Sequence, residues 1–344
     1  MVKTYMSVHR PVQLGLCCMN LTLRGQKPPI YSSRTIIQRI IKEKGMNELK
    51  CRVRANCEDL IKMIEWNEKN GIKVFRISSD MFPHKTNPKV EDYDFDFVKD
   101  LLKEAGDLAK KYGQRITMHP GQYNVVGTPN KVSFQKTIDD LLYQATLLDL
   151  MGMGDDSVMV VHGGGMYGDK EATKKRWCEQ FKLLPQNVQK RLVLENCEKC
   201  FHIQDCLDIS DVIHIPVVFD SHHYTCYNQL HPDIQLESES YYIPLILETW
   251  KRRGIKPKFH VSEQGAGRCG HHSDYIENLP EYMLEIPEKY GVNIDIMIEA
   301  KKKELAVFKL YEKYPHLNCK RKKIKFIKKV SPKKDSETKV EDNS

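Results

Sequence analysis

The stretches VMVVHG (158–163), RLVLEN (191–196), PVVFDSHH (216–223), PKFHVSE (257–263) and IDIMIEA (294–300) repeat one pattern in the C-terminal half of the chain. In each stretch, a short apolar run carries or ends on a His, Glu or Asp side chain. Short runs rich in Val, Ile and Leu predict buried strands, and helical patterns follow most of them. Strands that alternate with helices favour a parallel sheet, whose polar strand ends would share one site.

Eight such units occur along the chain. The predicted strands are residues 12–18, 72–77, 115–118, 157–161, 191–194, 215–219, 258–261 and 292–298. Helical spacing predicts helices over 56–70, 97–112 and 132–151, and Gly71, Gly113 and Gly254 stand where helices should end. Eight units in about 300 residues predict an α/β fold of the TIM (β/α)8 barrel type, with its site at the C-terminal strand ends. A doubly wound open sheet would leave two or more units unplaced.

The positive charge of the chain is concentrated at its C-terminal end. The net charge is +8, from 54 Lys and Arg against 46 Asp and Glu. Residues 301–344 hold 15 Lys and Arg against 6 Asp and Glu, so residues 1–300 hold 39 against 40. We therefore predict a barrel domain over residues 1–310 and a basic, partly disordered tail over 311–344. Such a tail could bind phosphates or direct the chain to a nucleus or nucleoid, or it could simply be a solvated end.

Composition argues against a membrane or secreted protein. The sequence has no run of 18 apolar residues, and its first residues lack the apolar segment and cleavage site of a secretion signal. We expect an intracellular protein whose eleven cysteines stay reduced. Cys197 and Cys200 form a CxxC, but the second CxxC of a four-thiolate zinc site is missing.

Imidazole and carboxylate side chains at the predicted strand ends indicate a metal cluster. The stretch TMHPGQYNVV (117–126) adds a strand-end histidine and a Pro-Gly turn that would present Gln122 and Tyr123 outward. Barrel geometry would direct the strand-end side chains into one cavity, where they could bind Zn²⁺ or Mn²⁺. Divalent ions would also relieve the repulsion between buried Glu195 and Glu299. The candidate ligands are His119, His162, Glu195, Asp220, His223, His260, His272 and Glu299.

The residues alone leave three functions open. Two or three ions about 3.5 to 4 Å apart suit phosphoryl transfer, because they activate a nucleophile and neutralise the leaving oxygen. The same cluster in the same fold could serve a sugar isomerase or epimerase. A non-catalytic DNA-binding protein anchored by the basic tail is the third interpretation. The glycine-rich stretch 163–168 lacks the Lys-Ser/Thr of a P-loop and is interpreted as a turn.

Together, these motifs resemble the UV damage endonucleases, barrel enzymes related to the three-metal apurinic endonucleases. The resemblance runs from about residue 12 to residue 304. Its carriers, in order, are LGLCCMNLTL, FRISSDMFPH, TMHPGQYNVV, VMVVHGGG, LVLEN, VVFDSHH, PKFHVSE, HHSDYI and IMIEAKKKE. It implies DNA repair by a nick immediately 5′ of UV photoproducts, both cyclobutane dimers and 6-4 photoproducts, and of some other lesions. Attack of a metal-activated hydroxide on phosphorus would leave a 3′-hydroxyl and a 5′-phosphate.

The resemblance also implies roles for single residues in the metal site. The eight candidate ligands would bind up to three ions, with manganese expected first and zinc, magnesium or cobalt as alternatives. Glu195 and Glu299 would also act in catalysis. His272 is preferred to His271 because it directly precedes Ser-Asp-Tyr. Lys258 matches a lysine that the family converts to N6-carboxylysine, and His84 matches a further active-site histidine.

Four residues are implied to contact damaged double-stranded DNA, the expected partner of a monomeric enzyme. Gln122 and Tyr123 match residues that probe the duplex by entering its base stack, a step that costs less at a lesion. Asn20 matches a residue of the family's pocket. Leu16 stands where the family often has tyrosine in a Gly-Tyr-x-x-x-Asn pattern, so we expect an altered lesion preference.

Overall fold

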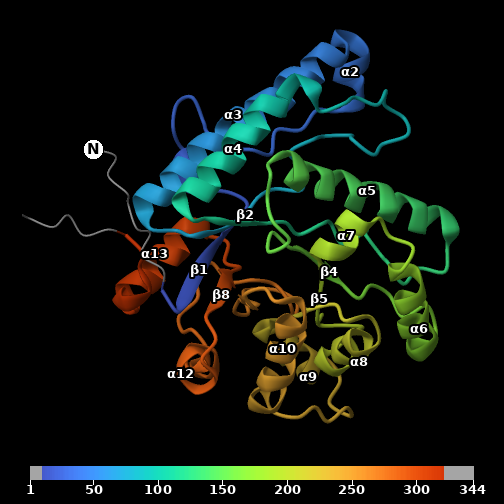
Figure 1. The fold of residues 1–344 in the computed structure, drawn as a ribbon, viewed down its shortest axis with the longest axis vertical. Helices are drawn as coiled ribbons and strands as arrows, with labels where there is room; N and C mark the ends of the chain where they lie inside the picture. Colours follow the sequence, from blue (N-terminus) through green and yellow to red (C-terminus); the bar gives the residue numbers. More distant parts are fainter. Residues whose placement is uncertain (1–9, 321–344) are drawn as a thin grey trace, which may run out of the picture.

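The fold is a closed barrel of eight parallel strands, seen in a computed structural model that describes residues 10–320 (Figure 1). The strands follow the order β3-β2-β1-β8-β7-β6-β5-β4. A parallel bridge joins Met118, just after β3, to Met159 in β4. Met118 N donates to Val158 O over 2.9 Å, and Val160 N donates to Met118 O over 3.0 Å. These bonds close the circle, so the predicted TIM barrel is confirmed.

Each predicted strand overlaps an observed one. The strands are β1 (Val12–Cys17), β2 (Val74–Arg76), β3 (Arg115–Thr117), β4 (Met159–His162), β5 (Leu192–Glu195), β6 (Val217–Asp220), β7 (Lys258–Val261) and β8 (Ile294–Ile298). The helices of the described residues are α1 (Leu21–Arg24), α2 (Gln38–Lys44), α3 (Met46–Asn70), α4 (Lys99–Tyr112), α5 (Lys131–Leu150), α6 (Lys170–Phe181), α7 (Gln186–Arg191), α8 (Ile203–Ile213), α9 (Ser221–Leu230), α10 (Glu239–Arg253), α11 (Glu281–Leu284), α12 (Ile286–Tyr290) and α13 (Lys303–Lys313), with short 3₁₀ turns η1 (Asp96–Val98) and η2 (Pro315–Leu317).

The predicted helix ends agree with the structure better than the predicted helix starts do. Gly71, Gly113 and Gly254 cap α3, α4 and α10 with φ values of 75°, 61° and 70°, a conformation that glycine adopts without strain. By contrast, α3 begins at Met46, ten residues before the predicted start at residue 56. The expected domain boundary at residue 310 falls within α13. Residues 321–344, which hold most of the expected tail, lie outside the described residues.

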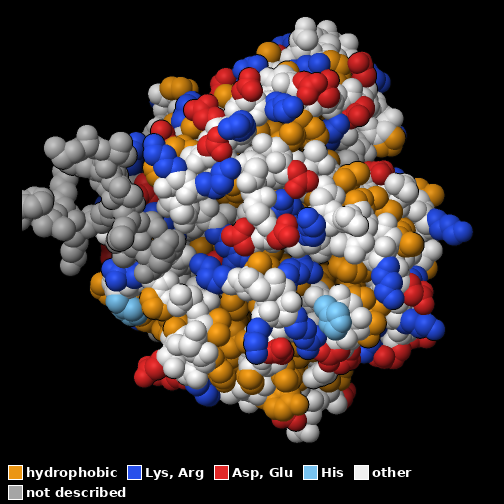
Figure 2. All heavy atoms as spheres, in the orientation of Figure 1, with side chains coloured by type: hydrophobic (Ala, Val, Ile, Leu, Met, Phe, Trp, Pro, Cys, Tyr) orange, Lys and Arg blue, Asp and Glu red, His pale blue; other side chains and the backbone are white. Residues whose placement is uncertain are grey.

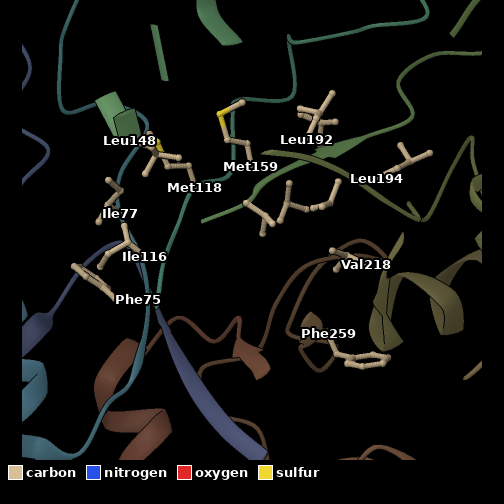
Figure 3. Close-up of a cluster of buried hydrophobic side chains, with 14 of the residues drawn as sticks. Phe75, Ile77, Ile116, Met118, Leu148, Met159, Leu192, Leu194, Val218 and Phe259 are labelled. Atoms are coloured by element: carbon tan, nitrogen blue, oxygen red, sulfur yellow. The ribbon is translucent and has the colours of Figure 1, made fainter. Parts of the chain in front are cut away.

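The hydrophobic core lies between the strands and the surrounding helices. Figure 3 shows side chains from neighbouring strands, among them Phe75, Ile116, Met159 and Leu192, gathered in one cluster with Leu148 of α5. In the ribbon, α3 and α4 lie side by side over one flank of the barrel, and α8, α9 and α10 lie over another (Figure 1). Burial of each such side chain stabilises the fold by roughly 1.5 to 3 kcal/mol. This packing holds the strands in place, and with them the strand ends that carry the site.

Charged side chains close the N-terminal end of the barrel. Arg115 Nη1 lies 2.8 Å from Asp295 Oδ2, and Lys256 Nζ lies 2.5 Å from Asp295 Oδ1. Asp295 is fully buried. These three residues, which we call the basal ion cluster, match one carboxylate with two cations from the chain itself.

The surface carries both signs of charge. On the face shown in Figure 2, Lys and Arg side chains are interspersed with Asp and Glu, which agrees with the near-zero balance of residues 1–300. Among residues 10–320, no helix has both the length and the apolar character needed to cross a bilayer.

Candidate metal centre

All eight predicted ligands, here called the ligand cluster, lie together at the C-terminal ends of the strands. His162, Glu195 and Asp220 are the last residues of β4, β5 and β6. His260 lies in β7, Glu299 directly follows β8, and His119 follows β3. His223 stands in the first turn of α9, and His272 bridges to Gln264 in the loop after β7. Parallel strands present their carboxyl ends at one rim, which explains why residues so far apart in sequence meet.

Three overlapping groups within the ligand cluster could each hold an ion. They are His119 with Glu195 and His260, Glu195 with Asp220 and His223, and Asp220 with His260 and Glu299. The ligand atoms of each group lie within 4.8 Å of one another. Glu195, Asp220 and His260 each belong to two groups. Shared carboxylates of this kind suit ions that lie a few ångströms apart.

The remaining two histidines lie at the edge of these groups. His162 Nε2 is 3.6 Å from Glu195 Oε2, and the His162 ring lies between those of His119 and His223, with centroids 5.1 and 5.4 Å away. His272 Nε2 is 3.9 Å from Glu299 Oε2. The structure therefore brings the full predicted set into one connected group.

Glu195 is the centre of the ligand cluster. His260 Nδ1 lies 2.6 Å from its Oε1, and His119 Nε2 lies 3.0 Å from its Oε2. Burial raises the pKa of Glu195, but His260 and His162 outweigh burial and hold it well below its ordinary value. Burial lowers the pKa of His162 to about 4 and also lowers that of His260, against the attraction of Glu195. The lowered pKa values favour an ionised carboxylate and neutral imidazoles, which are the forms that bind metals.

Two buried atoms without protein partners show where ions would fit. Asp220 Oδ1 accepts hydrogen bonds from the backbone N–H groups of His222 and His223 over 2.7 and 2.8 Å, whereas its Oδ2 has no hydrogen-bond partner. His260 uses Nδ1 toward Glu195, and its buried Nε2 is also unpartnered. Unpaired buried polar atoms are costly. The residues present therefore fit a cluster of divalent ions bound by imidazole and carboxylate groups.

Asn196 positions two of these ligands, a role that sequence reasoning missed. Its side chain accepts a hydrogen bond from Asp220 N over 2.8 Å and donates one to Asp220 O over 3.0 Å. Its backbone carbonyl lies 3.0 Å from His223 Nδ1. Burial lowers the pKa of His223, but the Asp220 and Glu195 carboxylates outweigh it and raise that pKa to about 10. The LEN motif contained this asparagine, but only contacts between strands reveal its role.

Arg76 is a second residue that sequence reasoning missed. It ends β2 and forms an ion pair with Glu299 through Nη1 and Oε1. Burial raises the pKa of Glu299, but Arg76 and His260 outweigh burial and hold it well below its ordinary value. A search of the predicted strand ends for arginine as well as for His, Asp and Glu would have found Arg76 in the stretch FRISS.

Lys258 lies below the ligand cluster inside the barrel. It is fully buried, and its Nζ donates to Thr117 Oγ1 over 3.3 Å. Burial and then the positive charge of Arg76 lower the pKa of Lys258 to about 8. About a tenth of this side chain is therefore a neutral amine at pH 7, far more than for an ordinary lysine.

A pocket of about 320 Å³ opens above the ligand cluster. Its lining includes Arg76, His119, Gln122, His162, His223, His272 and Glu299. Tyr123, next to Gln122, is 70% exposed, and its hydroxyl donates to Asp140 Oδ1 over 3.3 Å. Of the predicted probing pair, Gln122 lines this pocket, and the exposed Tyr123 follows it on the turn after β3.

Two other predicted site residues lie elsewhere. Leu16 is buried in the core between strands and helices, because alternate residues of β1 face opposite sides; its neighbour Cys17 faces the barrel interior with Val74 and Met297. Asn20 is buried and caps α1 by accepting a hydrogen bond from Leu23 N over 2.8 Å. Both side chains are buried in this structure, and a DNA-contact role for either stays a prediction.

His84 is also not brought into the ligand cluster. Its Nε2 lies 2.6 Å from Ile36 O, and its Nδ1 lies 3.0 Å from Asn87 Nδ2. Both ring nitrogens are engaged in the loop after β2, at a backbone φ of 63°. An active-site role for His84 stays a prediction.

Comparisons with known proteins agree with this arrangement. A protein of Acanthamoeba polyphaga mimivirus named "Putative UV-damage endonuclease" is 40% identical over 308 residues, which are 88% of this chain and 91% of that protein. The UV-damage endonuclease of Schizosaccharomyces pombe is 36% identical over 313 residues, which are 88% of this chain but 50% of that longer protein.

Solved structures and a family model extend the match. The crystal structure of SacUVDE has a TM-score of 0.75 and 31% identity, and the match covers 89% of this chain and 100% of that one. Endonuclease IV from Thermus thermophilus has a TM-score of 0.53 and 13% identity over 89% of this chain and 98% of its own, a likeness of fold alone. The model of the family described as UV-endonuclease UvdE matches residues 12–331. This chain therefore belongs to the UV-endonuclease UvdE family.

Proposed function

We propose that this chain cuts damaged double-stranded DNA immediately 5′ of UV photoproducts, namely cyclobutane dimers and 6-4 photoproducts. The observation that carries the proposal is the ligand cluster, which lies under a pocket that Gln122 lines, next to the exposed Tyr123. Family membership and the names of the relatives favour this function over a sugar isomerase or a non-catalytic DNA-binding protein.

The residues of the chain would divide the reaction among them. Glu195, Asp220 and Glu299 would hold divalent ions together with the five histidines of the ligand cluster. When bound, such ions lower the pKa of a water nucleophile and stabilise the charge that develops on phosphate oxygens. Arg76 would keep Glu299 ionised and in place. Attack of the water on phosphorus would break the P–O3′ bond and leave a 3′-hydroxyl and a 5′-phosphate.

We assign up to three ions to this centre, with manganese first and zinc, magnesium or cobalt as alternatives. Imidazole and carboxylate donors accept all of these metals, so the donor set supports a cluster of ions but does not select one metal. We also propose that Lys258 becomes N6-carboxylysine. Its lowered pKa supplies the neutral amine that reacts with carbon dioxide, and the resulting carbamate would face Arg76.

Gln122 and Tyr123 would test the duplex for damage. Unstacking bases of intact DNA costs a few kcal/mol, and a lesion that distorts the stack reduces this cost. The Tyr123 ring is exposed while its hydroxyl is held by Asp140, so the ring is presented in a fixed place. A preorganised wedge of this kind would enter only where the stack is already weakened.

The direct test is to map the cut. The protein is incubated with Mn²⁺ and a duplex that contains one cyclobutane dimer and carries a label at the 5′ end of the damaged strand. We expect one product that ends at the phosphodiester immediately 5′ of the dimer, with a 3′-hydroxyl that a polymerase can extend. No product, or equal cutting of the undamaged duplex, would contradict the proposal.

Two further expectations concern the whole chain. We propose that it acts as a monomer and that its basic C-terminal residues assist binding to DNA or direction to a nucleus or nucleoid. Removal of residues 319–344 should leave cutting at low salt intact and reduce the salt dependence of binding by roughly 0.9 per lost phosphate contact. Loss of all cutting in this variant would contradict an accessory role for the tail.

A further inference from the structure

The glycine-rich stretch after His162 does more than turn the chain. Residues 163–169 read GGGMYGD and pass between two neighbouring loops of the barrel rim. A Cβ on Gly163 would lie 2.4 Å from the ring of buried Phe201, and a Cβ on Gly164 would lie 2.3 Å from Val125 Cγ1. Only glycines allow this close approach. The stretch is therefore packed against the turn that carries Gln122 and Tyr123 on one side and the loop after β5 on the other.

This tight packing ends in an exposed aromatic ring. Tyr167 is 47% exposed and has a left-handed backbone with φ of 51°, which non-glycine residues rarely adopt. The preceding Met166 is 37% exposed. Strained backbone of this type persists where surrounding structure holds it and occurs often at ligand-binding sites.

Hydrogen bonds hold the backbone next to Tyr167, and Arg176 lies over its ring. Met166 O accepts from Thr173 Oγ1 over 2.7 Å and from Asp169 N over 3.1 Å. The Arg176 guanidinium lies 5.7 Å from the centre of the Tyr167 ring, and Arg176 Nε donates to Gly127 O over 2.8 Å. Arg176 thus ties Tyr167 to the loop that begins with Gln122 and Tyr123. The exposed ring therefore lies on a loop that packs against the loop of the Gln122–Tyr123 pair and directly follows the ligand His162.

We propose that Tyr167 is a second base-stacking residue, which packs against an unstacked base of the DNA on the β4 side of the Gln122–Tyr123 pair. This inference rests on the proposed function. An aromatic ring can stack on any base, and a base pushed out of the duplex by a wedge needs an apolar face to replace the neighbours it has lost. Arg176, next to the ring, supplies positive charge for the adjoining phosphate.

The test compares variants that remove or keep the ring. Tyr167→Asn removes it and leaves a residue that accepts the left-handed backbone, so the loop should keep its shape. We expect this variant to raise KM for a duplex with one cyclobutane dimer roughly 5- to 150-fold, the range of one lost base stack. Tyr167→Phe should restore most of that loss because stacking does not require the hydroxyl.

Controls separate stacking from damage to the fold. Tyr241→Ala removes another exposed ring, 52% exposed on α10, and should leave KM as in the wild type. Bound manganese per chain should equal the wild-type value in every variant. A base analogue whose fluorescence falls on stacking, placed beside the dimer, should be quenched by the wild type and by Tyr167→Phe but not by Tyr167→Asn.

The outcomes distinguish this inference from the proposed function. If the wild type does not cut the dimer-containing duplex, the proposed function fails. If the wild type cuts and Tyr167→Asn matches it in KM and in quenching, the stacking role is wrong. An Asn variant that has lost bound manganese would also overturn it, because Tyr167 would then support the metal centre.

Discussion

The two ends of the barrel both bury charge, but only one end neutralises it with residues of the chain. In the basal ion cluster, Asp295 faces Arg115 and Lys256. At the opposite end, the three carboxylates of the ligand cluster face histidines, two of them held neutral, and one arginine, Arg76. Asp220 Oδ2 and His260 Nε2 stay without partners there. At the basal end, Arg115 Nη2 also lacks a hydrogen-bond partner, but each Asp295 oxygen faces a cation. The ends therefore differ in their carboxylates: those at the basal end are paired by the chain, whereas Asp220 Oδ2 is left open for a ligand.

The largest expected effect comes from removing a carboxylate at the C-terminal end. Glu299→Gln should reduce the rate of cutting of a dimer-containing duplex by a factor on the order of 10³, because an uncharged amide is a poor ligand and a poor partner for Arg76. Single-turnover rates with Mn²⁺ measure this effect. The matched control is Asp295→Asn at the basal end, which should cut within a few-fold of the wild type. Equal cutting rates for the wild type and Glu299→Gln would contradict the assignment of catalysis to the C-terminal end.

The next effect concerns stability at the N-terminal end. Asp295→Leu leaves the buried Arg115 guanidinium without its carboxylate and should lower the free energy of unfolding by about 3 to 5 kcal/mol. Urea denaturation at pH 7 measures this change. The double variant Arg115→Met with Asp295→Leu should recover much of the loss, since the remaining cation, Lys256, is 30% exposed and keeps its hydrogen bond to Gln13 Oε1 over 2.8 Å. A double variant as unstable as the single one would show that packing, rather than charge pairing, holds this end.

Lys258 lies between the two ends and should make stability depend on pH. Its pKa falls from 10.5 in the unfolded chain to about 8 in the fold. Between these values the unfolded chain binds more protons, so stability should rise as the pH rises from 8 to 10.5. In metal-free, carbonate-free buffer, the free energy of unfolding of the wild type minus that of Lys258→Met should rise by up to about 3 kcal/mol over this window. A constant difference across the window would contradict a buried amine.

The smallest expected effect separates the role of the Gln122–Tyr123 pair from that of the metal centre. Gln122→Ala combined with Tyr123→Ala should weaken binding to lesion-containing DNA by about 1 to 3 kcal/mol, the range for one stacking contact. Titration of labelled duplex measures this loss. Bound metal should remain at the wild-type level, and a loss of metal would show that the pair supports the ligands instead.

Sequence reasoning reached the barrel and the ligand cluster because both depend on periodic signals. Apolar runs such as 158–161 predict strands, and parallel strands bring their ends together whatever residues lie between. Arg76 and Asn196 escaped notice because their roles arise from contacts with Glu299 and Asp220, on other strands. Such contacts depend on register, which a strand pattern alone does not state.

The predicted site residues that lie away from the ligand cluster are placed there by contacts that the sequence pattern does not state. Both faces of the run that contains Leu16 are buried, although Gln13 and Gly15 occupy one of them. The sequence alone therefore did not state which face meets the barrel interior and which meets the helices. His84 has its main partner in the Ile36 carbonyl, 48 residues away in the sequence. The start of α3 was missed because half of residues 46–55 are polar or charged, and packing of Leu49 and Val53 against the core decides their helical state.

The number of divalent ions bound per chain tests the contrast between the two ends most directly. After dialysis against Mn²⁺ and removal of free metal, elemental analysis should find two or three ions per wild-type chain and the same number in Asp295→Asn. Glu195→Gln, which alters a residue shared by two of the three ligand groups, should lose most of them. A wild type that retains no metal, or a Glu195→Gln variant that retains as much as the wild type, would contradict the account.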